Sequence, residues 1–349
     1  GSGHCKPTLQ FGMSDIELTE MSDHPKQESQ PCSRALSAAL LLAVIGGLTV
    51  TLLLEWPRIQ AISESGEWGN LLLNFNYDST LPLIMFLLLP FSWLWPGRGK
   101  TQAPIVPVSR SKTVLTALIL GGLSLCMSHH VASLQINNQP FGELPPAYHD
   151  EYSYLLQSET YLDGRLSYPK HNTHPELFSQ FHVVNESRFA CRYLPATGLV
   201  IAPAIVSGNP YWGHWMCGAV TTICIFLSGN ELGGYRTGLF AGLFCALSPA
   251  LALFSNLLLA HHPTLLGLSS FLYFYLRMWR TKAVTMGVLA GMGLTFAMLS
   301  RPMAAAGFAF PMGVVLLANL IRPVKWLGDE ETPTRGTVLK LNLAVGLPI

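Results

Sequence analysis

The sequence predicts an all-α protein, a polytopic bundle of transmembrane helices with one large polar loop on its outer side. The 349 residues are 50% hydrophobic and only 12% charged, about half the charged fraction of a usual soluble domain. Mean hydropathy is +0.35. The hydrophobic residues are gathered into runs of roughly 20, the length that a helix needs to cross a bilayer. These runs lack the strict alternation of β-barrel strands.

Charge and cysteine content narrow the function classes further. The net charge is +1 and there is no basic cluster, so no nucleic-acid partner is expected. Seven cysteines are scattered without CxxC spacing, and only Cys191 falls within the large polar loop. A disulfide framework inside that loop is therefore excluded.

The N-terminal third is expected to hold a tail and two spans. Residues 1–34 are polar and predict a disordered cytoplasmic tail, whereas 35–349 form one transmembrane domain. Ala35–Leu54 is the first predicted span and Thr80–Trp95 the second, with residues 55–79 as the loop between them. Tryptophans near the ends of these runs suit a membrane interface.

The loop 96–112 sets the orientation. It contains Arg98, Lys100, Arg110 and Lys112 and no acidic residue, so the positive-inside rule places it in the cytoplasm. The third predicted span, 113–134, then leads to the outer face. Residues 135–209 become the large outer loop.

The rest of the chain alternates across the membrane. The predicted spans are Tyr211–Leu227, Thr237–Leu259, Pro263–Trp279, Ala283–Leu299 and Met303–Ile321, with an inner turn at Gly229–Arg236. The apolar piece 194–207 is broken by Pro195 and Pro203, and we leave open whether it spans the membrane or forms a juxtamembrane or re-entrant segment. A last apolar run begins near Val338 and stops at Ile349, from which we expect a piece of a longer protein.

This topology brings three groups of polar residues to one face. Asp150 and Glu151, His261 and His262, and Arg301 all fall on the outer side. The orientation follows from Lys and Arg in the opposite loops, so the placement of these polar groups on one face is an independent outcome. It is the sequence evidence for an active site.

The acidic pair is the candidate catalytic centre. Asp150 and Glu151 point in different directions on either a helix or a strand, so one can act as general base on an acceptor hydroxyl while the other orients a ligand or a metal. The alternative is that both are solvated loop acids without a chemical role. The position directly after a span, beside His149 and Tyr152, favours a site, and we include those two neighbours among the substrate-binding candidates.

The remaining candidates are basic or aromatic. Arg301 can hold a phosphate bidentately or snorkel to lipid headgroups. His261 and His262 fit a phosphate or acceptor contact, or a polar helix cap. Arg192 and Tyr193, near the end of the large loop, are candidates for facing a ligand.

Three short blocks resemble a known class of enzyme. His149–Leu155 (HDEYSYL), Gly164–Leu166 (GRL) and Arg192–Gly198 (RYLPATG) are similar to segments of the GT-C integral membrane glycosyltransferases of the family 39 type. That branch includes protein O-mannosyltransferases and lipid A aminoarabinose transferases, and the similarity is greatest to bacterial, largely uncharacterised members. It covers roughly residues 113–321. Leu194 stands where those relatives usually have proline.

The resemblance implies a reaction and its partners. Such enzymes move a sugar from a polyprenyl-phosphate donor to an acceptor hydroxyl of a glycan, lipid or protein, at the outer face of the membrane. The acids, most often the Asp, would activate the acceptor, and Arg301, less surely His262, would hold the donor phosphate. A divalent metal, Mg²⁺ or Mn²⁺, on the acids is left open, and no other cofactor is implied. The expected location is the bacterial inner membrane, with the site facing the periplasm.

A polytopic transporter or another non-enzymatic membrane protein is the alternative. Transporters place ionisable residues near the bilayer midplane at broken helices. In this sequence the notable charges lie instead at the outer ends of spans and in one outer loop. That distribution favours surface chemistry.

Overall fold

The computed structural model describes residues 31–66, 108–178, 181–323 and 332–349. The chain divides into two compact units, residues 1–103 and 104–349. Most of the predicted tail and all of the predicted second span lie outside the described residues.

In the first unit, α1 (Pro31–Ser65) contains the predicted first span and continues beyond it. The prediction of a loop from residue 55 is therefore wrong as far as Ser65. The helix passes through Pro57, and the Arg58 guanidinium lies 2.8 Å from the Glu55 carboxylate. Such a pair, three residues apart, supports a helix beyond its apolar run.

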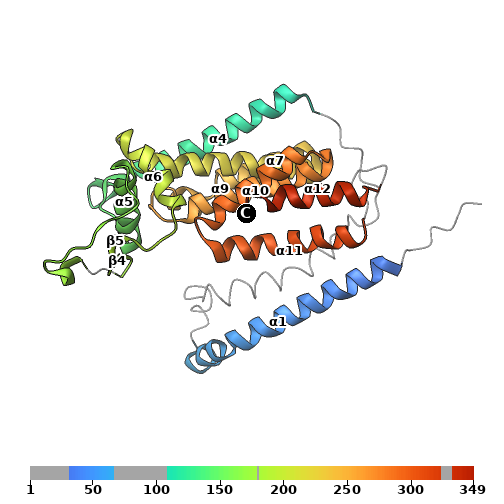
Figure 1. Cartoon of the computed structure of the whole chain (residues 1–349), viewed down its shortest axis with the longest axis horizontal. Coiled ribbons are helices and arrows are strands. Elements are labelled where there is room, and N and C mark those ends of the chain that lie inside the picture. The colour runs from blue at the N-terminus through green and yellow to red at the C-terminus, as the bar shows by residue number, and fades with distance from the viewer. Residues whose placement is uncertain (1–30, 67–107, 179–180, 324–331) are drawn as a thin grey trace, which may run out of the picture. The chain divides into compact units, whose positions relative to one another are not determined.

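The second unit is a bundle of helices (Figure 1). Its long members are α4 (Arg110–Ser133), α7 (Trp212–Ala246), α9 (His261–Thr281), α10 (Val284–Met298), α11 (Pro302–Ile321) and α12 (Arg335–Gly346). Among the described residues, α4, α7 and α11 are long and apolar enough to cross a membrane. Neighbours pack in the order α4, α7, α9, α10, and α11 and α12 pack on α10.

The helix α7 contains a chain reversal. Gly234 has φ 81° and ψ 179°, a conformation that glycine adopts without a steric penalty. A Cβ built on Gly229 would lie 2.9 Å from the Cα of Gly238, yet residues nine apart in a straight helix are about 13 Å apart. The chain therefore doubles back at Gly234, which confirms the predicted turn at 229–236.

The segment that follows this reversal ends earlier than expected. The helix stops at Ala246, and the short α8 (Pro249–Phe254) follows, with Ser248 as its N-cap and Pro249 in its first turn. Proline at that position starts a new helix and cannot continue the old one. The predicted span 237–259 is thus divided into two helices and a final segment of turns.

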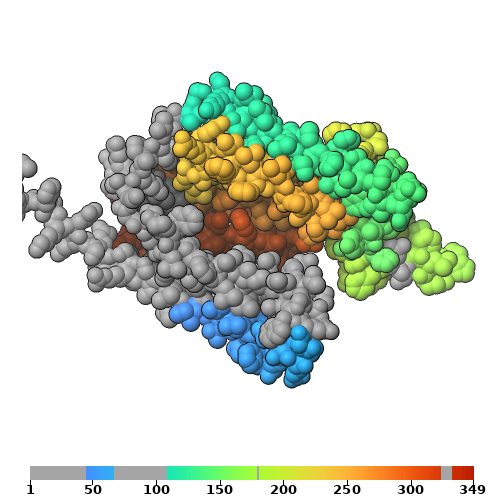
Figure 2. Space-filling view, turned by 180° about the vertical axis from the view of Figure 1, so that it is seen from behind, coloured from blue at the N-terminus to red at the C-terminus, as the bar shows by residue number. Residues whose placement is uncertain are grey.

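The loop that was predicted to lie on the outer side, residues 135–209, is more structured than expected. It contains β1 (Gln135–Ile136), β2 (Gln139–Pro140), η1 (Phe141–Glu143), α5 (His149–Leu162), β3 (Tyr168–Pro169), η2 (Pro175–Phe178), β4 (Val183–Asn185), β5 (Arg188–Cys191) and α6 (Ala196–Val206). Figure 2 shows the green and yellow-green residues after α4 gathered at one end of this unit.

Five strands correct the all-α prediction for this loop. β1 pairs with β2 through Asn137 and Asn138, which both have positive φ, as a two-residue hairpin turn of type I′ requires. The second sheet has the order β3-β5-β4, all antiparallel. Strands of two to four residues are too short to show an alternating pattern.

The helix α6 corresponds to the apolar piece 194–207. Its 11 residues extend about 16 Å, which is about half the thickness of the hydrocarbon core. Its buried side includes Ala196, Thr197 and Gly198, and it packs between α5 and α7. It is too short to span.

Two of the three apolar clusters found among the described residues of this unit each join several elements. The larger one joins α9 to α12 and includes Phe271, Tyr275, Trp279 and Leu294. The other lies beneath α5 and includes Tyr154, Ile201, Trp215 and Leu258. Because Tyr154 is on α5 and Trp215 is on α7, the second cluster packs α5 onto the bundle.

The close packing of α9 on α10 gives a stability prediction. A Cβ on Gly267 would lie 2.6 Å from the backbone N of Ala297, so Gly267→Ala should lower the free energy of unfolding by about 1–3 kcal/mol. Gly122 has nothing within 4 Å, and Gly122→Ala should leave stability unchanged or raise it by up to about 1 kcal/mol. Thermal unfolding in detergent measures both. Equal melting temperatures for the two variants would contradict the packing.

Candidate active site

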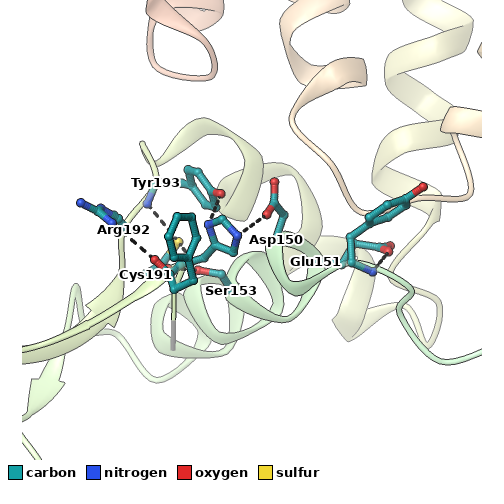
Figure 3. Close-up of polar contacts among 9 residues, drawn as sticks. Asp150, Glu151, Ser153, Cys191, Arg192 and Tyr193 are labelled. Atoms are coloured by element: carbon teal, nitrogen blue, oxygen red, sulfur yellow. Dashed lines mark hydrogen bonds and ion pairs between the residues drawn. The ribbon is translucent and has the colours of Figure 1, made fainter. Parts of the chain in front are cut away.

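The acidic pair lies in the first turn of α5. The chain reaches this helix through Tyr148, whose extended backbone forms the N-cap, and acidic groups in a first turn interact favourably with the helix dipole. Consecutive side chains on a helix point about 100° apart. In Figure 3, Asp150 accordingly leaves the helix on the side of Cys191 and Tyr193, and Glu151 leaves it on another side.

Glu151 is buried and bonded to the backbone. The residue is only 1% exposed to solvent. One oxygen accepts hydrogen bonds from the backbone N–H groups of Ala147 (2.9 Å) and Tyr148 (3.2 Å). The other accepts from the N–H of Leu258 at 2.8 Å. Glu151 thus caps α5 and ties it to the segment before α9.

Asp150 has a different environment. Its side chain is 33% exposed, and Oδ1 lies 2.9 Å from Nε2 of His182. The other ring nitrogen of His182, Nδ1, is hydrogen-bonded to the hydroxyl of Tyr193 at 2.5 Å. Asp150, His182 and Tyr193 therefore form a continuous chain of polar contacts.

The phenols beside this chain are held protonated. Burial raises the pKa of Tyr193 to about 12, the Asp150 charge adds to the rise, and the Arg301 charge opposes it. Burial likewise raises the pKa of Tyr154, with the same opposing influence of Arg301. The two tyrosine rings stack with centroids 4.8 Å apart. Both phenols are thus neutral hydrogen-bond donors at physiological pH.

Arg301 is positioned by the turn before α11, where it is the N-cap. In that turn the Leu299 carbonyl accepts from the N–H of Ala196, the first residue of α6, at 3.1 Å. Ser300 Oγ lies 3.4 Å from Thr197 Oγ1. These contacts hold the backbone of the turn in place. The side chain of Arg301 itself remains exposed.

His261 lies within the electrostatic influence of both Asp150 and Arg301. It is the first residue of α9, and the charges of Arg301 and Asp150 both act on its imidazole. The structure therefore brings Asp150, His261 and Arg301, from the starts of three helices, into one electrostatic neighbourhood. Tyr193 belongs to the same neighbourhood.

Other predicted residues lie elsewhere. His262 is fully buried, with its ring 5.9 Å from that of His214 inside the bundle. His149 and Tyr152 are exposed, as is Arg192, whose guanidinium contacts the Phe181 carbonyl at 3.4 Å. A substrate contact for these four stays a prediction.

His182 was missed by the sequence analysis. It is a lone histidine in a polar loop, with no second residue at a spacing typical of a site. Its partner Asp150 is 32 positions away, and only the folding of the loop onto α5 brings the two together. The neighbouring Tyr193 was named, but without its partner.

The acidic pair does not fit a shared metal site. Within the described ranges, no group of three or more His, Cys, Asp or Glu side chains is arranged to hold an ion. Both oxygens of Glu151 accept from backbone N–H groups, and a cation would compete with these donors for the same lone pairs.

A comparison with protein families matches part of the chain. Residues 191–341 match the family described as dolichyl-phosphate-mannose-protein mannosyltransferase, a family of integral membrane glycosyltransferases. The match covers less than half of the chain. It includes Tyr193, His261 and Arg301, whereas Asp150 and His182 precede it. No curated protein and no solved structure matches.

The burial of Glu151 predicts a stability defect. Glu151→Gln replaces one accepting oxygen by an amide NH₂ that faces backbone N–H groups, so unfolding should become easier by about 1–3 kcal/mol. Glu159→Gln, at an exposed position of the same helix, should change stability by less than about 0.5 kcal/mol. Thermal unfolding in detergent compares the two, and a Glu151→Gln variant as stable as the control would contradict the role given to these hydrogen bonds.

Proposed function

We propose that this chain is a multi-pass membrane glycosyltransferase that moves a sugar from a polyprenyl-phosphate donor to an acceptor hydroxyl. One observation carries the proposal: a partly exposed carboxylate and an exposed arginine lie at the starts of α5 and α11, and the charges of both act on the imidazole at the start of α9. The family match over residues 191–341 supports it, because that segment supplies the two basic residues.

Asp150 is the proposed general base. One of its oxygens is held by His182, and the partial exposure of the side chain leaves the other within reach of an acceptor. The acceptor oxygen attacks the anomeric carbon and loses its proton to Asp150. The bond between that carbon and the phosphate oxygen breaks, and the phosphate leaves with the electron pair. Attack opposite the leaving phosphate inverts the anomeric centre, as the family resemblance implies.

Arg301 and His261 are the proposed phosphate-binding residues. Negative charge grows on the phosphate as the bond to the sugar breaks, and a fixed guanidinium stabilises this charge most strongly in the transition state. Arg301 suits that role because its backbone is held by the turn before α11 while its side chain stays exposed. His261 adds a hydrogen-bond donor on the same side.

Glu151 has a positioning role in this proposal. Its carboxylate accepts three backbone hydrogen bonds, so little capacity remains for an acceptor proton. We assign the chemistry to Asp150 and the orientation of the α5 first turn to Glu151.

The substrates follow from the class of enzyme. The family description names dolichyl-phosphate mannose, so polyprenyl-phosphate mannose is the first donor to test. A lipid-anchored donor requires a site at the membrane surface. We propose that this end of the bundle faces the periplasm or the outside, where a glycan, lipid or protein supplies the hydroxyl.

Turnover of Asp150→Asn tests the base. The chain is reconstituted in vesicles with polyprenyl-phosphate mannose and candidate acceptors, and release of polyprenyl phosphate is measured. Loss of a general base should lower kcat by about 10²–10⁴-fold, while Glu159→Gln keeps wild-type turnover. Wild-type turnover in Asp150→Asn, with folding intact, would refute the assignment. Transport of donor or acceptor without release of polyprenyl phosphate would favour the transporter.

Arg301 gives a second test with a different signature. Arg301→Gln should lower kcat by about 10²–10³-fold, because the guanidinium acts mainly on charge that develops in the transition state. Arg165→Gln is the matched control, since Arg165 is an exposed arginine that lies over the Tyr168 ring. An equal effect of the two substitutions would show that Arg301 contributes only general surface charge.

A further inference from the structure

The backbone of His182 is anchored on the same helix as Asp150. Its carbonyl accepts a hydrogen bond from Ser153 Oγ at 2.6 Å and another from the N–H of Arg192 at 3.0 Å. Ser153 is fully buried and lies three residues after Asp150 on α5. One helix therefore fixes both the carboxylate and the loop that brings the imidazole to it.

The His182 ring is enclosed on two sides. Tyr193 stacks on it with centroids 5.4 Å apart and planes at 21°. Phe181 meets it edge to face at 4.7 Å and 84°. The side chain is 20% exposed. These contacts restrict the ring to the plane in which both nitrogens reach their partners.

For a neutral His182 ring, the contact with Asp150 selects one tautomer. An ionised carboxylate can only accept, so the proton shared with Asp150 Oδ1 belongs to Nε2. In the neutral ring Nδ1 is then an acceptor, and the Tyr193 hydroxyl donates to it. The raised pKa of Tyr193 keeps that proton on the phenol. The donors Tyr193 and His182 thus point in the same direction, toward Asp150, and such aligned hydrogen bonds strengthen one another.

We propose that His182 is a positioning residue that holds the base Asp150 in its productive rotamer, with Tyr193 fixing the tautomer of His182. The inference rests on the proposed function and adds a residue that lies outside the family match. By occupying Oδ1, His182 sets the χ angles of Asp150 and presents Oδ2 to the acceptor hydroxyl. It acts on the rate of transfer and leaves donor binding to Arg301 and His261.

A double-mutant cycle with Asp150 tests this role. His182→Ala should lower kcat by about 10- to 100-fold, the effect of losing a hydrogen bond to a charged group, and leave the affinity for polyprenyl phosphate unchanged. His182→Gln keeps a donor for Oδ1 and should recover part of the loss. In the Asp150→Asn background, followed by single turnover of labelled donor, His182→Ala should cause no further loss.

The opposite results overturn the proposal. An equal loss from His182→Ala in both backgrounds, or a matching loss of affinity for polyprenyl phosphate, would show that the residue only supports the fold. Wild-type turnover in His182→Ala would show that it has no role.

A spectroscopic readout separates this inference from the proposed function. With ¹⁵N-labelled histidine, the His182 signals, assigned by their absence in His182→Gln, should show the Nε2–H tautomer. Asp150→Asn should shift Nε2, and Tyr193→Phe, which keeps the ring stacking, should shift Nδ1. A wild type without turnover would refute the proposed function alone. A His182 spectrum unaffected by Asp150→Asn would refute the positioning role, whatever the turnover.

Discussion

The candidate site depends on the three backbone hydrogen bonds that the Glu151 carboxylate accepts. Two of them close the N-terminus of α5, and the third, from Leu258, fixes that helix to the segment leading into α9. A buried carboxylate is costly unless its lone pairs are satisfied, so these donors leave α5 one favourable position on the bundle. With α5 fixed, Asp150 is directed toward His182, and its charge acts on the imidazole of His261. The hydrogen bond from Leu258 therefore fixes the helix of the acid relative to the start of α9, where the proposed phosphate-binding residue His261 lies.

The structure gives the two adjacent carboxylates different environments, and the proposed division of tasks follows from them. Glu151 is buried and bonded to backbone, which suits orientation. Asp150 is partly exposed and paired with His182, which suits the proposed general base. The apolar cluster of Tyr154, Trp215 and Leu258 supports both from below, because it packs α5 against helices of the bundle. Position on the helix, a difference of one residue, decides which acid has which environment.

Much of the helical framework could be predicted from the sequence, because runs of about 20 apolar residues are a strong signal. The spans now seen as α4 and α11, and the reversal at Gly234, are examples. The expectation that Asp150, His261 and Arg301 share the outer face rested on loop charges and stays a prediction, while the charges of Asp150 and Arg301 both act on the His261 imidazole. The short strands were not predicted, because strands of two to four residues show no alternating pattern. The extension of α1 to Ser65 was not predicted either, because it is supported by the pairing of Arg58 with Glu55 beyond the apolar run. The His182 contact depends on a fold-back of the loop that no local pattern encodes.

The most direct test of this division compares Asp150→Asn with Glu151→Gln in one reconstituted preparation, measuring polyprenyl-phosphate release per folded molecule together with the melting temperature. The account predicts that Asp150→Asn melts as the wild type does but has lost turnover. Glu151→Gln should melt at a lower temperature, yet its folded molecules should retain most of their turnover. A Glu151→Gln variant that is stable but inactive, beside an active Asp150→Asn, would contradict the account by exchanging the two roles.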